Sequence, residues 1–259
     1  MSAHLAVTRD GPVAVLTIDR PEKRNAMTAR MWAELPDVLA GAAADPTVRV
    51  LVVTGAGPSF CAGADIGALL GGDDPADPMA DVRRHNLAAQ AALREFPTPT
   101  VAMIRGHCIG GGVEIAAACD LRFTDPTGRF GVTPAKVGIV YAPSSVQALI
   151  DLVGPATAKY LLFSGEQIDA ATALRTGLVD RVVDPADLET EVHRFAAVLA
   201  SRSALTQRAV KEVVRALEGG GDGAAEAARW YRETVSCGEL AEGVAAFAER
   251  RPPRFPWPV

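Results

Sequence analysis

The fold is decided by the segment Val101-Ala102-Met103-Ile104-Arg105-Gly106-His107-Cys108-Ile109-Gly110-Gly111-Gly112-Val113-Glu114-Ile115-Ala116-Ala117-Ala118-Cys119-Asp120. Its first residues form a short apolar run typical of a buried strand, and the alanine-rich residues after the glycines favour a helix. The three glycines lack a Cβ and therefore let a ligand approach the backbone closely. Because a helix N-terminus carries unpaired N–H groups and the positive end of the helix dipole, it would stabilise an oxygen that gains negative charge.

A second segment repeats this arrangement of a buried strand followed by small residues. The apolar run at residues 50–54 predicts a strand, and Ala62, Gly63 and Ala64 follow it. The backbone N–H groups of Ala64 and Gly111 could together bind one oxygen atom as it gains negative charge. In the first turn of the predicted helix, Glu114 adds a carboxylate at the same place.

Four motifs in this order resemble the crotonase family, the enoyl-CoA hydratase/isomerase superfamily. They are RPEKRNAM at residues 20–27, FCAGADI at 60–66, GGGVEIAAACD at 110–120 and AFAERR at 246–251. The resemblance extends from about residue 20 to residue 255. It implies an α/β fold with a crotonase-like ββα spiral as the acyl-CoA-binding core in residues 1–185. A C-terminal helical region in residues 186–259 would serve trimerisation.

The order of predicted elements independently favours an α/β fold with a parallel sheet and helices outside it. Strands are predicted at residues 5–9, 13–18, 50–54, 101–104, 121–124 and 181–183, the first two joined by a hairpin at Asp10-Gly11. Helices are predicted at residues 28–43, 79–95, 186–200, 205–217, 224–235 and 239–250. Pro36 should kink or split the first helix. Residues 71–78 predict a mobile loop, and Ser144 and Ser145 are expected to cap a helix.

Composition excludes several classes of protein. The chain has 259 residues, of which 49% are hydrophobic, and its net charge of −5 argues against nucleic-acid binding. It shows no signal-peptide pattern and no apolar run that would span a bilayer, so we expect a cytoplasmic protein without a membrane partner. The four cysteines and four histidines form no ligand motif, which argues against a metal site. Cys61, near the proposed site, is best interpreted as a small buried side chain.

Four residues are candidates for catalysis. By the resemblance, Ala64 and Gly111 would form an oxyanion hole, and Glu114 matches the family's catalytic glutamate. The apolar neighbours of Glu114 should raise its pKa, although a carboxylate at a helix N-terminus can also serve only to stabilise the helix. Tyr141 matches a site tyrosine in the family branch that decarboxylates methylmalonyl-CoA, but that branch has a histidine where this chain has Ala64. The alternative for Tyr141 is a wall residue of the acyl pocket.

The position of a second glutamate distinguishes the possible reactions. Hydratases of the family typically have this glutamate in the loop after the next strand, and counting from Phe130-Gly131 its position holds Pro134. An enoyl-CoA hydratase/isomerase is the preferred interpretation. A methylmalonyl-CoA-decarboxylase-like lyase and a catalytically silent acyl-CoA-binding protein stay open. A dinucleotide-binding fold is disfavoured because no G-x-G-x-x-G follows the first strand–helix turn.

The resemblance also assigns residues to substrate binding. They are Arg24, Ala26, Ala62, Asp65, Ile66, Gly110, Pro134 and Arg250. Arg24 and Ala26 match positions near the adenine end of coenzyme A. Arg250 could reach a CoA phosphate, including one on a neighbouring subunit, although a solvated surface arginine explains it nearly as well. Coenzyme A would be part of the substrate, so no separate cofactor is expected, and the resemblance implies a homotrimer or a hexamer built from trimers.

Overall fold

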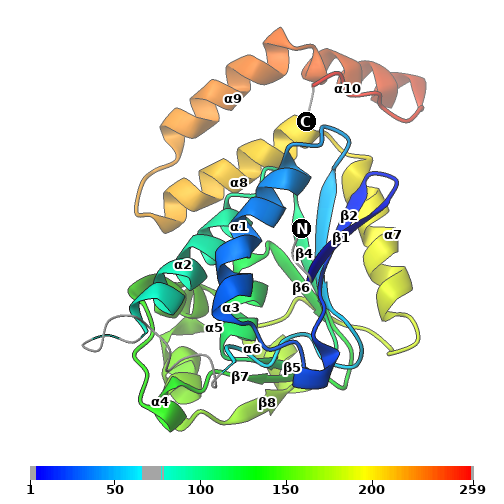
Figure 1. The fold of residues 1–259 in the computed structure, drawn as a ribbon. Coiled ribbons are helices and arrows are strands. Elements are labelled where there is room, and N and C mark those ends of the chain that lie inside the picture. Colours follow the sequence, from blue (N-terminus) through cyan, green and yellow to red (C-terminus); the bar gives the residue numbers. More distant parts are fainter. Residues whose placement is uncertain (1–3, 66–76, 78, 258–259) are drawn as a thin grey trace.

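The computed structural model describes residues 4–65, 77 and 79–257, and its centre is a six-stranded sheet (Figure 1). The strands follow the order β1 (Leu5–Asp10), β2 (Val13–Ile18), β3 (Val50–Gly55), β4 (Thr100–Ile104), β6 (Leu121–Thr124) and β9 (Arg181–Val182). Strands β1 and β2 form the predicted antiparallel hairpin. All other neighbours in this sheet are parallel, as the sequence pattern predicts.

A second, smaller sheet carries one side of the site. It contains β5 (His107–Ile109), β7 (Arg129–Gly131) and β8 (Gln167–Asp169), in that order. From β4 in the main sheet the chain enters β5 in the small sheet, continues into helix α3 (Gly111–Ala118), and returns to the main sheet as β6. This strand–strand–helix turn is the ββα unit that the family resemblance implies. The three short strands themselves were not predicted, since three residues show no clear periodicity.

Helices cover the sheets on the site side. They are the short 3₁₀ turn η1 (Pro21–Lys23), α1 (Ala29–Ala43), α2 (Ala80–Arg94), α4 (Pro134–Val137), α5 (Pro143–Ser164) and α6 (Ala170–Thr176). The side chain of Thr28 accepts a hydrogen bond from the Met31 N–H and so caps α1, as expected. Helix α1 continues through Pro36, so the predicted split does not occur. The buried side chains of Leu35 and Leu39 anchor the helix in the core on both sides of the proline.

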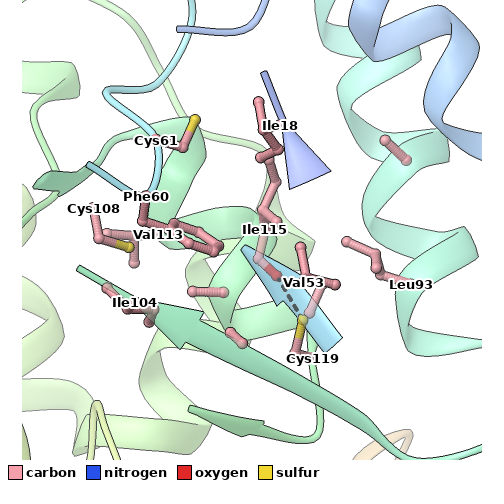
Figure 2. Packing of buried hydrophobic residues seen from close by; sticks show 14 of the residues in the cluster. Ile18, Val53, Phe60, Cys61, Leu93, Ile104, Cys108, Val113, Ile115 and Cys119 are labelled. Atoms are coloured by element: carbon pink, nitrogen blue, oxygen red, sulfur yellow. Dashed lines mark hydrogen bonds between the residues drawn. The ribbon is translucent and has the colours of Figure 1, made fainter. Parts of the chain in front are cut away.

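Buried apolar side chains from both sheets and from α1, α2 and α3 form the main core. Figure 2 shows Ile18, Val53, Leu93 and Ile115 packed together near the middle of this core. Three cysteines, Cys61, Cys108 and Cys119, are buried and free. Burial raises the pKa of the Cys61 thiol to about 12, which makes it a poor nucleophile and agrees with its interpretation as a buried apolar group.

The last quarter of the chain is helical, as predicted. It contains α7 (Leu188–Ala200), α8 (Ala204–Glu218), α9 (Ala224–Ser236) and α10 (Glu239–Glu249). Although it lies beyond residue 185, α7 packs on the outer face of the main sheet, where Leu188 and Val192 contact the core around Phe123. Helices α9 and α10 project from the body at the end opposite α4 (Figure 1). Of the helices in the described ranges, none is both long and apolar enough to cross a membrane.

Candidate active site

A cavity bounded by α1, α2, α3 and α4 brings together most of the candidate residues, and we call it the acyl chamber. The candidates that line it are Ala62, Ala64, Gly110, Gly111, Glu114, Pro134 and Tyr141. Trp32, Val82, Asn86 and Ile139 add further walls. A larger cavity of about 650 Å³, between α3, α5 and α8, contains none of the candidates. Within the described part of the chain, no cluster of three or more His, Cys, Asp or Glu residues could hold a metal ion.

Two backbone amides lie side by side at the edge of the acyl chamber. A Cβ placed on Gly111 would lie 3.6 Å from the Ala64 nitrogen, and one placed on Gly63 would lie 3.3 Å from the Gly111 nitrogen. Neither Ala64 nor Gly111 donates a backbone hydrogen bond within the described residues. These two N–H groups are therefore available to one acceptor oxygen, as the sequence pattern suggests.

The chain on both sides of the Ala64 amide is fixed by backbone hydrogen bonds. The Met27 N–H donates to the Gly63 oxygen at 2.8 Å, and the Asp65 N–H donates to the Met27 oxygen at 2.9 Å. Residues next to Cys61 pair with β5 as an added short strand: the Cys61 N–H donates to the His107 oxygen, and the Ile109 N–H donates to the Cys61 oxygen, both at 2.9 Å. This pairing holds the Ala64 segment beside the start of α3.

Gly110 makes the sharp turn that exposes the Gly111 amide. Its backbone has φ +55° and ψ −117°, a conformation that residues with a Cβ rarely adopt. The Gly110 N–H donates to the Gly131 oxygen at 2.8 Å, which ties the turn to β7. Helix α3 begins at the next residue, so the Gly111 N–H lies at the positive end of the helix dipole.

Glu114 presents its carboxylate to the acyl chamber from the first turn of α3. Its Oε2 accepts a hydrogen bond from Nδ2 of Asn86 at 2.9 Å. Burial raises the pKa of Glu114, whereas the polar side chains of Ser145 and Asn86 and the positive charge of Arg94 oppose this rise. The direction agrees with the expectation from its apolar neighbours. A carboxyl group with a raised pKa is suited to proton transfer closer to neutral pH.

Tyr141 lies beside the same turn. Its hydroxyl oxygen would be 3.6 Å from a Cβ placed on Gly110. Burial and, secondarily, the charge of Glu114 raise the pKa of the Tyr141 phenol, so this hydroxyl stays protonated and neutral. A neutral hydroxyl at this position can be a hydrogen-bond donor or a wall of the chamber, and both interpretations from the sequence stay open.

Pro134 lines the acyl chamber where the second glutamate would be expected. It is buried at the first position of α4, where a proline is well tolerated because its missing N–H would have no partner in the helix. The short helix ends at Gly138 in the left-handed conformation. Among the described residues that line the chamber, Glu114 is the only carboxylate.

The candidates for the coenzyme A arm lie outside the chamber. The exposed Arg24 accepts a hydrogen bond from the Ala62 N–H at its carbonyl oxygen, 2.9 Å away. Burial, followed by the charges of Arg24 and Arg129, lowers the pKa of His107. The carbonyl of Ala26 accepts from Nη1 of Arg20 at 2.7 Å.

Two other candidates, Asp65 and Arg250, do not line the chamber within one chain. The carboxylate of Asp65 pairs with the guanidinium of Arg20 at 3.0 Å, which secures the loop. Arg250 is exposed at the end of α10 and does not line the chamber. Ile66 and most of the loop predicted at residues 71–78 lie outside the described residues.

Sequence reasoning missed Asn86, which contacts Glu114 directly. Its signal was present, because Asn86, Gln90 and Arg94 recur every four residues along α2 and so share one face of the helix. It also misassigned Ser145, which does not cap α5. Ala142 is the N-cap residue and makes no side-chain hydrogen bond, and the buried Ser145 hydroxyl bonds to Gln90 instead.

The fold and the chamber can now be compared with known proteins. The chain matches the sequence model of enoyl-CoA hydratase/isomerase over residues 8–257. The chain belongs to the enoyl-CoA hydratase/isomerase family. This assignment confirms the resemblance seen in the four sequence motifs.

Relatives in the enoyl-CoA hydratase/isomerase family align with nearly the whole chain. A Thermus thermophilus protein, provisionally named an enoyl-CoA hydratase, is 39% identical over 258 residues, which cover 95% of this chain and 98% of that protein. The (E)-benzylidenesuccinyl-CoA hydratase of Thauera aromatica is 35% identical over 249 residues, covering 94% and 95%. A crystal structure from Hyphomonas neptunium, provisionally assigned to the same family, superposes with a TM-score of 0.91 at 32% identity and covers 97% of both chains.

Proposed function

We propose that this chain hydrates enoyl-CoA thioesters or isomerises their double bonds through a thioester enolate. The observation that carries the proposal is that Glu114, whose raised pKa suits proton transfer, lines the same chamber as the paired amides of Ala64 and Gly111. Membership of the family and the hydratase names of its relatives support the same reaction class.

The thioester oxygen would lie between the N–H groups of Ala64 and Gly111. As the carbonyl becomes an enolate, negative charge grows on this oxygen, and both hydrogen bonds strengthen. One such donor typically contributes about 3–4 kcal/mol to the stability of the transition state. Because the amides are fixed by the backbone, little reorganisation is needed when the charge develops.

Glu114 would carry the proton in both reactions. In hydration its carboxylate takes a proton from water while the water oxygen bonds to C3, and the π electrons of the C2–C3 bond move onto the thioester oxygen. The enolate then collapses and C2 takes the proton back from Glu114, which gives a 3-hydroxyacyl thioester. In isomerisation, Glu114 removes a proton from one carbon of the allylic system and returns it to another. Both sequences need a single carboxylate that is ionised at the start.

The second candidate function is decarboxylation of a methylmalonyl-CoA-like thioester. It is favoured by Pro134, which supplies no second acid or base, and by the neutral hydroxyl of Tyr141 beside Gly110. Here the bond between C2 and the carboxylate breaks, carbon dioxide leaves, and its electron pair forms the same enolate. Protonation of C2 by an acid then completes the reaction. No base is needed for the bond-breaking step.

Binding of the coenzyme A arm is proposed for the basic surface around Arg24, with Arg250 as a further candidate for a phosphate. Coenzyme A would be carried as part of the substrate, and no separate cofactor takes part in these steps. A cationic side chain near a phosphate contributes a charge-assisted hydrogen bond.

The test is incubation with a panel of enoyl-CoA and malonyl-type CoA thioesters, read by mass spectrometry. A product heavier by one water supports hydration, a rearranged product of equal mass supports isomerisation, and loss of carbon dioxide supports the second candidate. The same panel should be run with Glu114→Gln, which removes the proposed base. Glu226→Gln is its matched control, since Glu226 also lies in the first turn of a helix, α9, but does not line the chamber. Binding without turnover of any thioester would leave a catalytically silent acyl-CoA-binding protein and refute both reactions.

A further inference from the structure

A ladder of three polar side chains on α2 ends at the catalytic candidate Glu114. Asn86, Gln90 and Arg94 are spaced four residues apart, so they lie on one face of the helix. Arg94 Nη2 donates to Gln90 Oε1 at 3.0 Å, and Gln90 Nε2 donates to Asn86 Oδ1 at 2.7 Å. Asn86 Nδ2 then donates to Glu114 Oε2 at 2.9 Å. Of these four residues, the proposed chemistry uses only Glu114, so the three residues of the ladder have no role in it.

The chemistry of the side chains gives the ladder one direction. A guanidinium can only donate hydrogen bonds, so the group of Gln90 that faces Arg94 must be its carbonyl oxygen. The amide nitrogen of Gln90 therefore faces Asn86 and makes the Asn86 oxygen the acceptor. This leaves the amide nitrogen of Asn86 pointing to Glu114. Arg94 thus determines, through two amides, that Glu114 receives a donor.

Burial makes this direction costly to reverse. Gln90 is only 1% exposed, and the buried Ser145 hydroxyl lies 3.0 Å from its Nε2 and donates to its Oε1 at 3.3 Å. A flipped Gln90 amide would turn its N–H₂ group toward the guanidinium of Arg94 and its oxygen toward the oxygen of Asn86. Buried polar groups without compatible partners destabilise the folded protein, so the flipped orientation is disfavoured.

We infer that Asn86 is a positioning residue for the Glu114 carboxylate, and that Gln90 and Arg94 fix the direction of its hydrogen bond. By holding Oε2, Asn86 restricts rotation of the carboxylate in the chamber. Pro134, opposite, has no side-chain donor or acceptor that could share this task. The inference rests on the proposed function only for its effect on turnover, because the hydrogen bond itself is a property of the free protein.

The charged and titratable groups around Glu114 come from several elements. Helix α2 contributes Arg94 and the chamber-lining Arg83, the loop before α5 contributes Tyr141, and the segment beside β5 contributes Cys61. Burial keeps the last two protonated near neutral pH. A donor from Asn86 stabilises the ionised carboxylate more than the protonated acid, so its removal should raise the pKa of Glu114 further.

The direct test compares the protonation of Glu114 in the wild type and in Asn86→Leu, which has a similar size but no donor. Infrared difference spectra follow the C=O band of the protonated acid against pH, and Glu114→Gln identifies that band. We expect the midpoint pH of this band to rise by about one unit in Asn86→Leu, because one charge-assisted hydrogen bond to the carboxylate is lost. An unchanged midpoint in a folded variant would overturn the inference.

Two further variants test the ladder beyond Asn86. Gln90→Met removes the amide that orients Asn86 and keeps the length of the side chain, so the midpoint should rise in the same direction by a smaller amount. Gln147→Met is the matched control, because Gln147 bonds Asp151 on the exposed side of α5 and has no part in the ladder. A shift as large in Gln147→Met as in Gln90→Met would contradict the inference.

Kinetics then separates positioning from a general effect on structure. Asn86→Leu should lower kcat about tenfold and leave KM nearly unchanged. In the Glu114→Gln background the same substitution should have no further effect, because Asn86 acts through Glu114. An equal loss in both backgrounds would overturn the inference. A wild-type chain inactive on every thioester would refute the proposed function, and the infrared comparison would still decide the role of Asn86.

Discussion

The indole ring of Trp32 packs edge-on against the backbone of Gly111, and its Cζ2 atom would lie 2.8 Å from a Cβ at that residue. This contact leaves no room for a side chain at the start of α3. Trp32 is itself 1% exposed and held in the core, so it cannot move away easily. The neighbouring ring therefore requires glycine at position 111, whereas the proposed hydrogen bond requires only that this residue has an N–H group.

The two requirements can be separated by a pair of variants. Gly111→Ala keeps the N–H and introduces the clash with Trp32, whereas Gly111→Pro introduces a similar clash and also removes the donor. We expect kcat of the proline variant to be about 10²–10³ lower than that of the alanine variant, because one oxyanion donor is lost. Steady-state kinetics of the two folded proteins checks this. Equal activity of the pair would refute the role of the Gly111 amide.

Replacement of the proposed base should distinguish the candidate reactions. Glu114→Gln keeps the size of the side chain but removes the base, so hydration or isomerisation should slow by about 10²–10⁴. Decarboxylation should be mildly affected by this change and strongly affected by Tyr141→Phe. Both variants should be assayed on both substrate types. Wild-type rates for Glu114→Gln on every enoyl-CoA tested would defeat the preferred function.

The raised pKa of Glu114 also predicts a cost to stability. Because burial raises the pKa of this acid in the folded state, folding is penalised once the carboxyl ionises; the penalty is relieved as pH falls through the raised pKa and is gone below the ordinary value of 4.5. Glu114→Gln should therefore melt at a higher temperature than the wild type at neutral pH. This difference should vanish in acid. Thermal unfolding followed at both pH values tests the sign, and a less stable variant at neutral pH would contradict it.

The C-terminal helices predict self-association into a homotrimer or a hexamer of trimers. Large apolar side chains stay exposed on α8, α9 and α10: Val210, Val214, Leu217, Tyr231, Val235, Leu240, Val244 and Phe247. Phe247 is 88% exposed, and apolar surface of this extent usually marks an interface. Light scattering should give a multiple of three chains, and Phe247→Glu should weaken the assembly. A wild-type monomer across micromolar concentrations would refute the prediction.

Local patterns predicted most of the long elements and the small-residue turns, although the longest helix, α5, was anticipated only at its start. Two examples of such local patterns are the apolar run at residues 50–54 and the glycines at 110–112. Their structure depends mainly on residues close by in the chain, so it can be predicted from local sequence. The small sheet was missed because β5, β7 and β8 exist only through pairing between distant segments. Asn86 was missed for a similar reason, since its partner Glu114 lies on another helix. Ser145 was assigned to a cap because local preference cannot reveal a buried partner such as Gln90.

The pairing of Cys61 with β5 has a consequence for how this scaffold can change. The separation of the Ala64 and Gly111 amides is set by main-chain hydrogen bonds, whereas much of the opposite wall is formed by replaceable side chains such as Val82, Ile139 and Val140. Substitutions in that wall can alter which acyl groups fit without altering the spacing of the two donors. Directed evolution toward new thioesters should therefore start from these wall positions and leave unchanged the backbone segments that carry the two N–H donors.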